Sequence, residues 1–252
     1  MKRLLIVVAV FLSVSGYAQK TADIGIWMGA SSYWGDMTKV NYGESINQMY
    51  GAFFRYNFNA RYSLRTSFLT GKIGAVGDME NTTWEFNKTA HDFTLMMEIN
   101  YLKYILGAKN TPFTPYIMGG IGVMYYPYFV DPAALSRINP SHNKGNIVRE
   151  ESIVATSIPF GMGVKWTFGK RLGVGVEVQF RKLLDDKLDD LDDPLAHVGL
   201  VSPTGNTNDA VIGDITYTDT WHNNDYVPFF GVNLTYSINL TNQVCPVYDS
   251  KK

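Results

Sequence analysis

The sequence predicts an all-β fold: an eight-stranded antiparallel transmembrane up-and-down β-barrel of the outer-membrane type, with its lumen filled by side chains. Three observations support this prediction. Segments of about ten residues alternate apolar with polar or small side chains, as a tilted transmembrane strand requires. Short and long connections between these segments alternate. Aromatic residues, which make up 14% of the chain, gather at the segment ends, as they do in the girdles of such barrels.

The eight predicted strands share one apolar face and one polar or small-residue face. They cover residues 23–31, 50–58, 62–68, 93–101, 117–125, 157–168, 172–181 and 229–238. A lipid-facing Arg or Lys at the bilayer midplane costs about 2–4 kcal/mol. The charged face must therefore point into the barrel. Eight strands enclose a narrow interior that side chains can fill, so we expect no open pore.

The connections between the predicted strands distinguish a membrane barrel from a soluble one. The short ones lie around residues 59–61, 107–110 and 169–170, and the long ones cover 33–49, 74–92, 127–152 and 182–224. Short turns on one side and long loops on the other are typical of outer-membrane barrels. An even number of strands also brings both termini to the same side. The sequence therefore predicts an integral protein of a Gram-negative outer membrane, with periplasmic N- and C-termini.

The N-terminus predicts export. Residues 1–18 have a basic start, an apolar run of limited length and small residues before Ala18, which are the parts of a secretory signal peptide. We therefore divide the chain into a signal peptide (1–18), an outer-membrane β-barrel (19–240) and a periplasmic C-terminal tail (241–252). Cys245, the single cysteine, lies in this tail, so no internal disulfide can form. A formal net charge of −1 argues against nucleic acid as a partner.

Six charged side chains are predicted to face the lumen. They are Arg55, Arg65, Glu98, Lys165, Glu177 and Arg181. Buried charges must be paired and hydrogen-bonded, so we expect a lumen charge network. The alternative is that these side chains line a path for a solute. These residues include four basic groups and only two acidic ones. Water or loop carboxylates would have to compensate the excess positive charge.

The densest run of charge follows the seventh predicted strand. Its carboxylates Asp185, Asp186, Asp189 and Asp190 are weak candidates for a calcium loop, because Ca²⁺ prefers oxygen ligands. The run lacks the spacing and the glycine of an EF-hand, so we favour a solvated surface loop. We expect no other metal site and no cofactor. The chain contains neither G-x-S-x-G nor H-E-x-x-H, and its four histidines fall in or beside the long loops, so we expect no enzyme and no small-molecule substrate.

The segment after the first predicted strand carries a family resemblance. Tyr33-Trp34-Gly35-Asp36 resembles the aromatic-x-Gly-Asp signature of the PorG family, an outer-membrane component of the type IX secretion system of Bacteroidetes. Tyr33, Gly35 and Asp36 are then the family-motif residues. Residues 61–65, 113–122 and 185–190 fit the same family in order and spacing.

The resemblance implies a structural role rather than catalysis. The barrel, surrounded by outer-membrane lipid, would anchor a periplasmic ring made of a PorK-like lipoprotein and a PorN-like subunit. Such a contact must lie on the side of the short turns, where the candidates are Asn59, Ala60, Arg61, Lys109, Lys170 and Cys245. Two alternatives remain open. One is a small surface-binding barrel, an adhesin or receptor that acts through its long loops. The other is a lipid-modifying enzyme with an active site at the rim.

Overall fold

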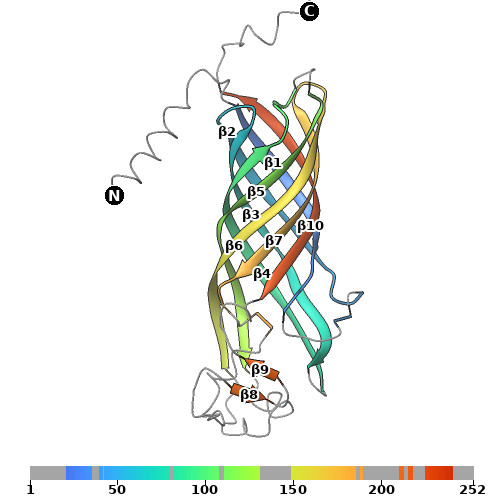
Figure 1. The fold of residues 1–252 in the computed structure, drawn as a ribbon, viewed down its shortest axis with the longest axis vertical. Helices are drawn as coiled ribbons and strands as arrows, with labels where there is room; N and C mark the ends of the chain where they lie inside the picture. The colour runs from blue at the N-terminus through green and yellow to red at the C-terminus, as the bar shows by residue number, and fades with distance from the viewer. Residues whose placement is uncertain are drawn as a thin grey trace, which may run out of the picture.

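Eight of the ten strands close into one antiparallel ring in the computed structural model, in the order β1-β10-β7-β6-β5-β4-β3-β2 (Figure 1). The ring strands are β1 (Thr21–Ser31), β2 (Asn47–Asn57), β3 (Tyr62–Met79), β4 (Thr82–Asn100), β5 (Phe113–Val130), β6 (Arg149–Phe168), β7 (Leu172–Leu183) and β10 (Tyr226–Asn239). A separate hairpin pairs β8 (Ala210–Ile212) with β9 (Ile215–Tyr217). The structure describes residues 21–35, 40–41, 43–79, 82–107, 111–130, 149–185, 188–189, 210–212, 215–217 and 225–240. The predicted eight-stranded antiparallel barrel is confirmed.

The first and last strands of the ring pair with each other. Thr21 lies opposite both Asn57 of β2 and Asn239 of β10, and β1 stays paired on both sides as far as Ser31. Every ring strand therefore has a hydrogen-bonded neighbour on each side. Lipid offers no hydrogen-bond partner to the backbone, so this closure is what allows strands to cross a membrane.

No helix in the described part of the chain is long and apolar enough to span a membrane.

The barrel has two unlike ends. At the turn end, residues 58–61, 101–112 and 169–171 connect β2 to β3, β4 to β5 and β6 to β7. Because Thr21 pairs with Asn239, β1 begins and β10 ends at this same end, which is uppermost in Figure 1. We call the opposite end the loop end; the β8–β9 hairpin lies beyond it in Figure 1.

The outer wall of the barrel is apolar across most of its height. Exposed apolar side chains from all eight ring strands include Ile26, Phe54, Phe68, Phe93, Ile121, Met162, Val176 and Val232. The inward positions between them carry polar, charged or small side chains, together with large apolar ones such as Trp27 and Phe53. A wall of this kind is stable only in lipid, so this is a transmembrane barrel of the outer-membrane type.

Two of the predicted long loops are largely strand, which corrects the sequence-based prediction. The segment 74–92 contains the ends of β3 and β4, which stay paired up to Met79 and Thr82, so the connection is only residues 80–81. The segment 127–152 likewise contains the ends of β5 and β6, which pair up to Val130 and Arg149. The strict alternation of short and long connections therefore fails between β3 and β4.

On β3 and β4 the physical reason is that the alternation changes phase at the loop end. Along β3, the outward side chains change from Phe68 to Thr70 and Lys72, while the inward positions become apolar, as at Ile73. In β4 the outward Thr89 likewise alternates with the buried Ala90. Apolar inside and polar outside is the pattern of a barrel wall in water. A search for one continuous apolar outer face therefore ends too early on these strands.

The apolar wall predicts that a charged substitution lowers the free energy of unfolding by an amount that depends on its depth in the bilayer. Val232 lies opposite Met28 and Val176, and all three side chains are exposed in the middle of the wall. Val232→Arg should lower the free energy of unfolding by about 2–4 kcal/mol, because the guanidinium would sit at the midplane of the bilayer. Urea titration in phospholipid vesicles, followed by tryptophan fluorescence, measures this change.

Ile238→Arg is the matched control for depth. Ile238 faces the same way on the same strand but lies near the turn end, opposite Ala22. An arginine there reaches the headgroups and should cost about 0–1 kcal/mol. Equal costs at the two positions would contradict the proposed placement of the wall in the bilayer.

Candidate functional site: the charged lumen and its two seals

A network of buried charges fills the lumen toward the turn end. It contains four cations, Arg55, Arg65, Lys165 and Arg181, and four carboxylates, Asp23, Asp92, Glu98 and Glu177. All eight side chains are at most 5% exposed. They project inward from six strands, because each occupies the inner phase of its strand. We refer to these eight residues as the charge network.

Glu98 of β4 pairs with three cations. Its Oε2 lies 2.8 Å from Arg55 Nε and 2.7 Å from Lys165 Nζ, and its Oε1 lies 3.5 Å from Arg65 Nη1. Glu98 thereby links β2, β3 and β6. A buried carboxylate loses its hydration, and these three partners replace it.

Glu177 of β7 is the second centre of the network. Arg65 donates to both its oxygens, at 2.8 Å (Nη1 to Oε2) and 3.0 Å (Nη2 to Oε1), in the bidentate arrangement that suits a guanidinium and a carboxylate. The Tyr116 hydroxyl and the Gln179 side-chain amide also donate to Glu177, and Asn233 Nδ2 donates to Oε2 at 3.1 Å. Glu177 thus connects β7 to β3, β5 and β10 across the lumen.

Two further carboxylates bring the network to four of each sign. Asp92 Oδ2 lies 3.0 Å from Arg181 Nη2, and Asp23 Oδ2 lies 3.5 Å from Arg55 Nη1. These two carboxylates compensate the imbalance of four basic groups against two acidic ones. Asp92 belongs, by the sequence-based prediction, to the long connection 74–92. It lies within β4, on the same face as Glu98.

Aromatic rings pack among these cations. The Phe53 ring centroid lies 4.0 Å from Arg65 Cζ and 5.0 Å from Arg55 Cζ, and the Tyr116 ring lies 4.2 Å from Lys165 Nζ. Together with the ion pairs, these rings fill the narrow interior with side chains. Small residues make the fit possible: a side chain at Gly231 would overlap the Trp27 ring. The lumen is packed, as the sequence predicts.

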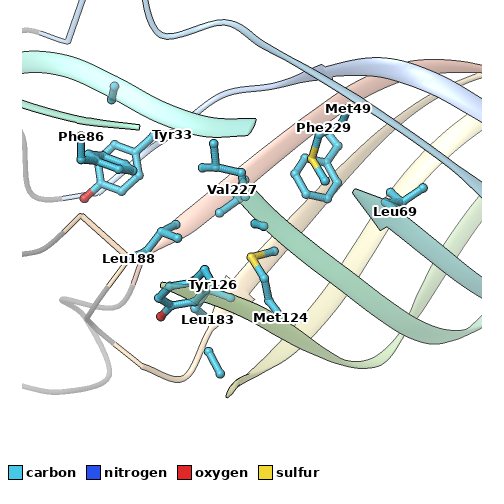
Figure 2. Packing of buried hydrophobic residues seen from close by; sticks show 14 of the residues in the cluster. Tyr33, Met49, Leu69, Phe86, Met124, Tyr126, Leu183, Leu188, Val227 and Phe229 are labelled. Atoms are coloured by element: carbon cyan, nitrogen blue, oxygen red, sulfur yellow. The ribbon is translucent and has the colours of Figure 1, made fainter. Parts of the chain in front are cut away.

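An apolar cluster fills the loop end of the lumen. Figure 2 shows its side chains gathered inside the ring strands, among them Met49, Leu69, Met124, Tyr126, Leu183, Leu188, Val227 and Phe229. Leu69, Met124, Leu183, Val227 and Phe229 have no exposed surface. The cluster contacts the charge network where the Phe229 ring lies 4.9 Å from Arg181 Cζ. It closes the lumen at this end.

The segment between β4 and β5 covers the turn end. Tyr104 is 7% exposed; its backbone N–H donates to Ala60 O at 2.9 Å, and its hydroxyl accepts from Thr167 Oγ1 at 2.8 Å. Beneath this segment is a cavity of about 10 Å³, lined by Thr21, Asp23, Arg55, Asn57, Asn59, Tyr104, Ile105, Leu106 and Lys165. Such a volume holds about one water molecule. The lumen is therefore sealed at both ends.

The aromatic-x-Gly-Asp segment joins three parts of the chain at the loop end. Trp34 and Tyr226 exchange backbone hydrogen bonds of 2.9 Å, which continues the β1–β10 pairing. The Tyr33 hydroxyl donates to Asp189 Oδ2 at 2.8 Å, and its ring packs edge-on against Phe86. A side chain at Gly35 would overlap the Tyr33 hydroxyl and the Asp225 carboxylate. Asp36 lies outside the described residues.

The acidic run after β7 is not simply a solvated loop where the structure describes it. Asp189 is 1% exposed and accepts the Tyr33 hydrogen bond, and Leu188 belongs to the apolar cluster. The interpretation as a solvated surface loop is therefore wrong for these two residues. Asp185 is partly exposed, and Asp186 and Asp190 lie outside the described residues. Within the described part of the chain, no group of three or more His, Cys, Asp or Glu side chains could hold a metal ion.

His91 and Asp92, adjacent in the chain, lie on opposite faces of β4. The His91 ring stacks between Phe68 and Tyr125 on the outer wall, and its Nδ1 lies 2.8 Å from Thr70 Oγ1. Asp92 points inward to Arg181. This pair therefore cannot work together as a catalytic dyad. The other three histidines, His142, His197 and His222, lie outside the described residues.

The candidate partner-contact residues lie at the turn end where they are described. Asn59 Oδ1 accepts from the backbone N–H groups of Arg61 and Tyr62, at 2.8 and 2.9 Å, and so holds the β2–β3 turn. The Ala60 carbonyl accepts from Tyr104, and Lys170 is exposed in the β6–β7 turn. Lys109 and Cys245 lie outside the described residues.

Sequence reasoning missed several members of the lumen site. They are Asp23, Asp92, Tyr104, Tyr116, Gln179 and Asn233. The alternation of inward and outward positions along a strand would have identified most of them. Asp92 lies on the same face of its strand as Glu98, and Gln179 lies on the same face as Glu177. No local signal indicates that Tyr104 folds over the mouth of the barrel.

Glu177 provides a direct test of the charge network. Glu177→Gln should lower the free energy of unfolding by about 3–5 kcal/mol, because it removes the bidentate carboxylate of the buried Arg65 and leaves only Glu98, at 3.5 Å. Conductance in planar bilayers should stay at the wild-type level, since the aromatic rings and both seals remain. Glu44→Gln, which changes an exposed carboxylate, is the control. An unchanged melting temperature for Glu177→Gln would show that the network does not stabilise the barrel.

Gly35 provides a test of the motif. Gly35→Ala should lower stability by about 1–3 kcal/mol, because the added methyl group must displace Tyr33 or Asp225. Gly43→Ala is the matched control, because a Cβ there would meet only Asn41 Oδ1, at 3.5 Å. Its effect should stay within about 0.5 kcal/mol. Equal effects of the two substitutions, measured by thermal unfolding in detergent, would remove this packing role from the motif.

Known structures with a similar fold are outer-membrane barrels. The chain is similar to the N-terminal β-barrel domain of OprF from Pseudomonas aeruginosa (9% identity, 88% of this chain and 100% of that one, TM-score 0.41). It is also similar to OprG of the same organism (10% identity, 88% of this chain and 98% of that one, TM-score 0.45). A third similar structure is Ail, the attachment invasion locus protein of Yersinia pestis (12% identity, 87% of this chain and 99% of that one, TM-score 0.44). No curated protein matches. Residues 2–247 match a family described as a domain of unknown function, DUF6089, and the chain belongs to this family.

Proposed function

We propose that this protein is a non-enzymatic component of the type IX secretion machinery that anchors a periplasmic ring to the outer membrane. The turn end would face the periplasm, together with both termini, and the loop end would face the cell exterior. The partners would be a PorK-like lipoprotein and a PorN-like subunit. The aromatic-x-Gly-Asp motif of the loop end, with Tyr33 and Gly35, supports the assignment to the PorG family.

The observation that carries the proposal is the sealing of the lumen. The charge network, the apolar cluster and the segment over the turn end together fill the barrel. A filled barrel does not conduct solutes through its centre, so it acts through its exposed surfaces. An anchor needs only a stable wall in the membrane and a well-ordered surface at one end.

The turn end is ordered in the way that an anchor requires. Arg61 Nη1 donates to the Tyr101 carbonyl at 2.8 Å, and Asn100 N–H donates to the Arg61 carbonyl at 2.7 Å. These bonds tie the β2–β3 turn to the segment after β4. A surface that is already ordered loses little conformational entropy when a partner binds.

Cross-linking in intact cells of the native host tests the anchor role. The full chain, carrying an affinity tag, should co-purify with the PorK-like and PorN-like ring proteins, identified by mass spectrometry. Removal of residues 241–252, or replacement of residues 59–61 by Gly-Ser-Gly, should reduce their recovery. A correctly folded, heat-modifiable wild-type barrel that recovers neither ring protein would contradict the secretion assignment.

One observation favours a surface-binding barrel as the second candidate. The β3–β4 and β5–β6 hairpins continue beyond the apolar wall, up to Met79 and Val130. They could present a binding surface outside the cell. Shortening the β3–β4 hairpin by residues 75–86 should then abolish adhesion to host or partner cells, whereas an anchor should still recover its ring proteins.

A further inference from the structure

We infer that the turn end carries a cationic docking platform that binds an acidic surface of the periplasmic partner. The platform consists of Arg61, Tyr101, Lys103 and Lys170. This inference rests on the proposed function for the direction in which the turn end faces. It adds the chemistry of the contact and two residues, Tyr101 and Lys103, that the candidate partner-contact residues do not include.

Among the described residues, the turn end carries exposed cations and no exposed carboxylate. Arg61, Lys103 and Lys170 are exposed at the turn end, one in each of its three connections. The exposed carboxylates among the described residues, Glu44, Glu85 and Glu151, all lie toward the loop end. The formal net charge of the chain is only −1. The positive potential at the turn end therefore comes from local arrangement and would attract an acidic surface.

The platform is held by contacts between neighbouring connections. The Arg61 guanidinium donates to the Tyr101 carbonyl, and the Ala60 carbonyl accepts from Tyr104 N–H at 2.9 Å and from Asn100 Nδ2 at 3.2 Å. On the other side, Gly107 packs against the Lys170 carbonyl so closely that a side chain would overlap it. The backbone that carries the three cations is thus fixed before a partner arrives.

A protein partner fits this position better than lipid headgroups do. Lys103 precedes Tyr104, whose side chain folds over the mouth of the barrel above Lys165 and the cavity beside Asp23. The segment that carries Lys103 therefore lies across the lumen axis, where the barrel excludes lipid. Arg171 makes the contrast clear, because it donates to the hydroxyl of Tyr236 on the lipid-facing wall, at 3.0 Å. Arg171 belongs to the membrane edge and is not part of the platform.

Tyr101 gives the platform an apolar contact. Its side chain is 74% exposed, the largest exposed fraction among the large apolar side chains of the described residues. Tyrosine and arginine are enriched among the residues that dominate binding energy at protein interfaces. The neighbouring lysines would set the approach and the orientation of an acidic partner.

Charge reversal in the full chain tests the platform. The variant Lys103→Glu/Lys170→Glu leaves Arg61 in place, because its guanidinium holds the Tyr101 carbonyl. Lys72→Glu, which reverses an exposed lysine toward the loop end, is the matched control. Recovery of the ring proteins after a zero-length carbodiimide cross-link, which joins amines to carboxylates, is measured in intact cells. Heat-modifiable mobility on gels verifies that each variant folds.

The double variant should lower ring-protein recovery about tenfold, and the control should equal wild type. Mass spectrometry of the wild-type product should place the links between Lys103 or Lys170 and acidic residues of the partner. In detergent extracts, raising the salt from about 0.1 M to about 1 M shortens the Debye length from about 10 Å to about 3 Å and should weaken the wild-type complex.

Three results would overturn the inference, and they separate it from the proposed function. Ring proteins recovered equally well by the double variant would leave the anchor role standing and remove the platform. Unchanged recovery together with loss of bound anionic phospholipid, measured by native mass spectrometry, would assign the cations to lipid headgroups. A wild-type chain that recovers no ring protein would overturn both.

Discussion

Closure of the hydrogen-bonded ring is the constraint on which the rest of this structure depends. A strand in lipid has no water to satisfy its backbone, so β1 must pair with β10 as well as with β2. Closing eight strands leaves a narrow interior, and the size of that interior limits which side chains fit inside it. Trp27 fits because Gly29 and Gly231 lie against its ring. The charges of the inner face are tolerated because each meets a counter-charge from another strand.

Along its length, the lumen has a charged part and an apolar part. Toward the turn end, Glu98 and Glu177 gather cations from strands on different sides of the barrel. Toward the loop end, Phe229, Met124 and their neighbours form an apolar cluster. On β3 and β4 the change coincides with the phase reversal of the wall, where outward side chains become polar. These two strands therefore pass from a membrane barrel to a water-exposed barrel without interruption.

The sequence predicted the ring and the inward direction of its charges because both follow from a period of two residues. It could not predict strand length beyond the apolar wall, because the apolar face moves from the outside to the inside at Thr70 and His91. The pairing of Arg65 with Glu177, rather than with the neighbouring Glu98 alone, depends on the stagger of the ring, which no local pattern encodes. Tyr104 and Asp189 were missed for a similar reason. Each lies outside a strand, and only the folded chain shows that it is buried.

The bond between Arg65 and Glu177 has a consequence for the assembly of the barrel. The two residues are 112 positions apart in the chain, and three strands separate β3 from β7 in either direction around the ring. In an open sheet these two side chains would lie far apart, and Glu177 would lose its arginine. Contacts between such distant residues form late, because the chain must first lose the entropy of a large loop. The ion pairs across the lumen therefore stabilise only the completed ring. A chain whose first and last strands have not yet paired remains an unstable, short-lived intermediate.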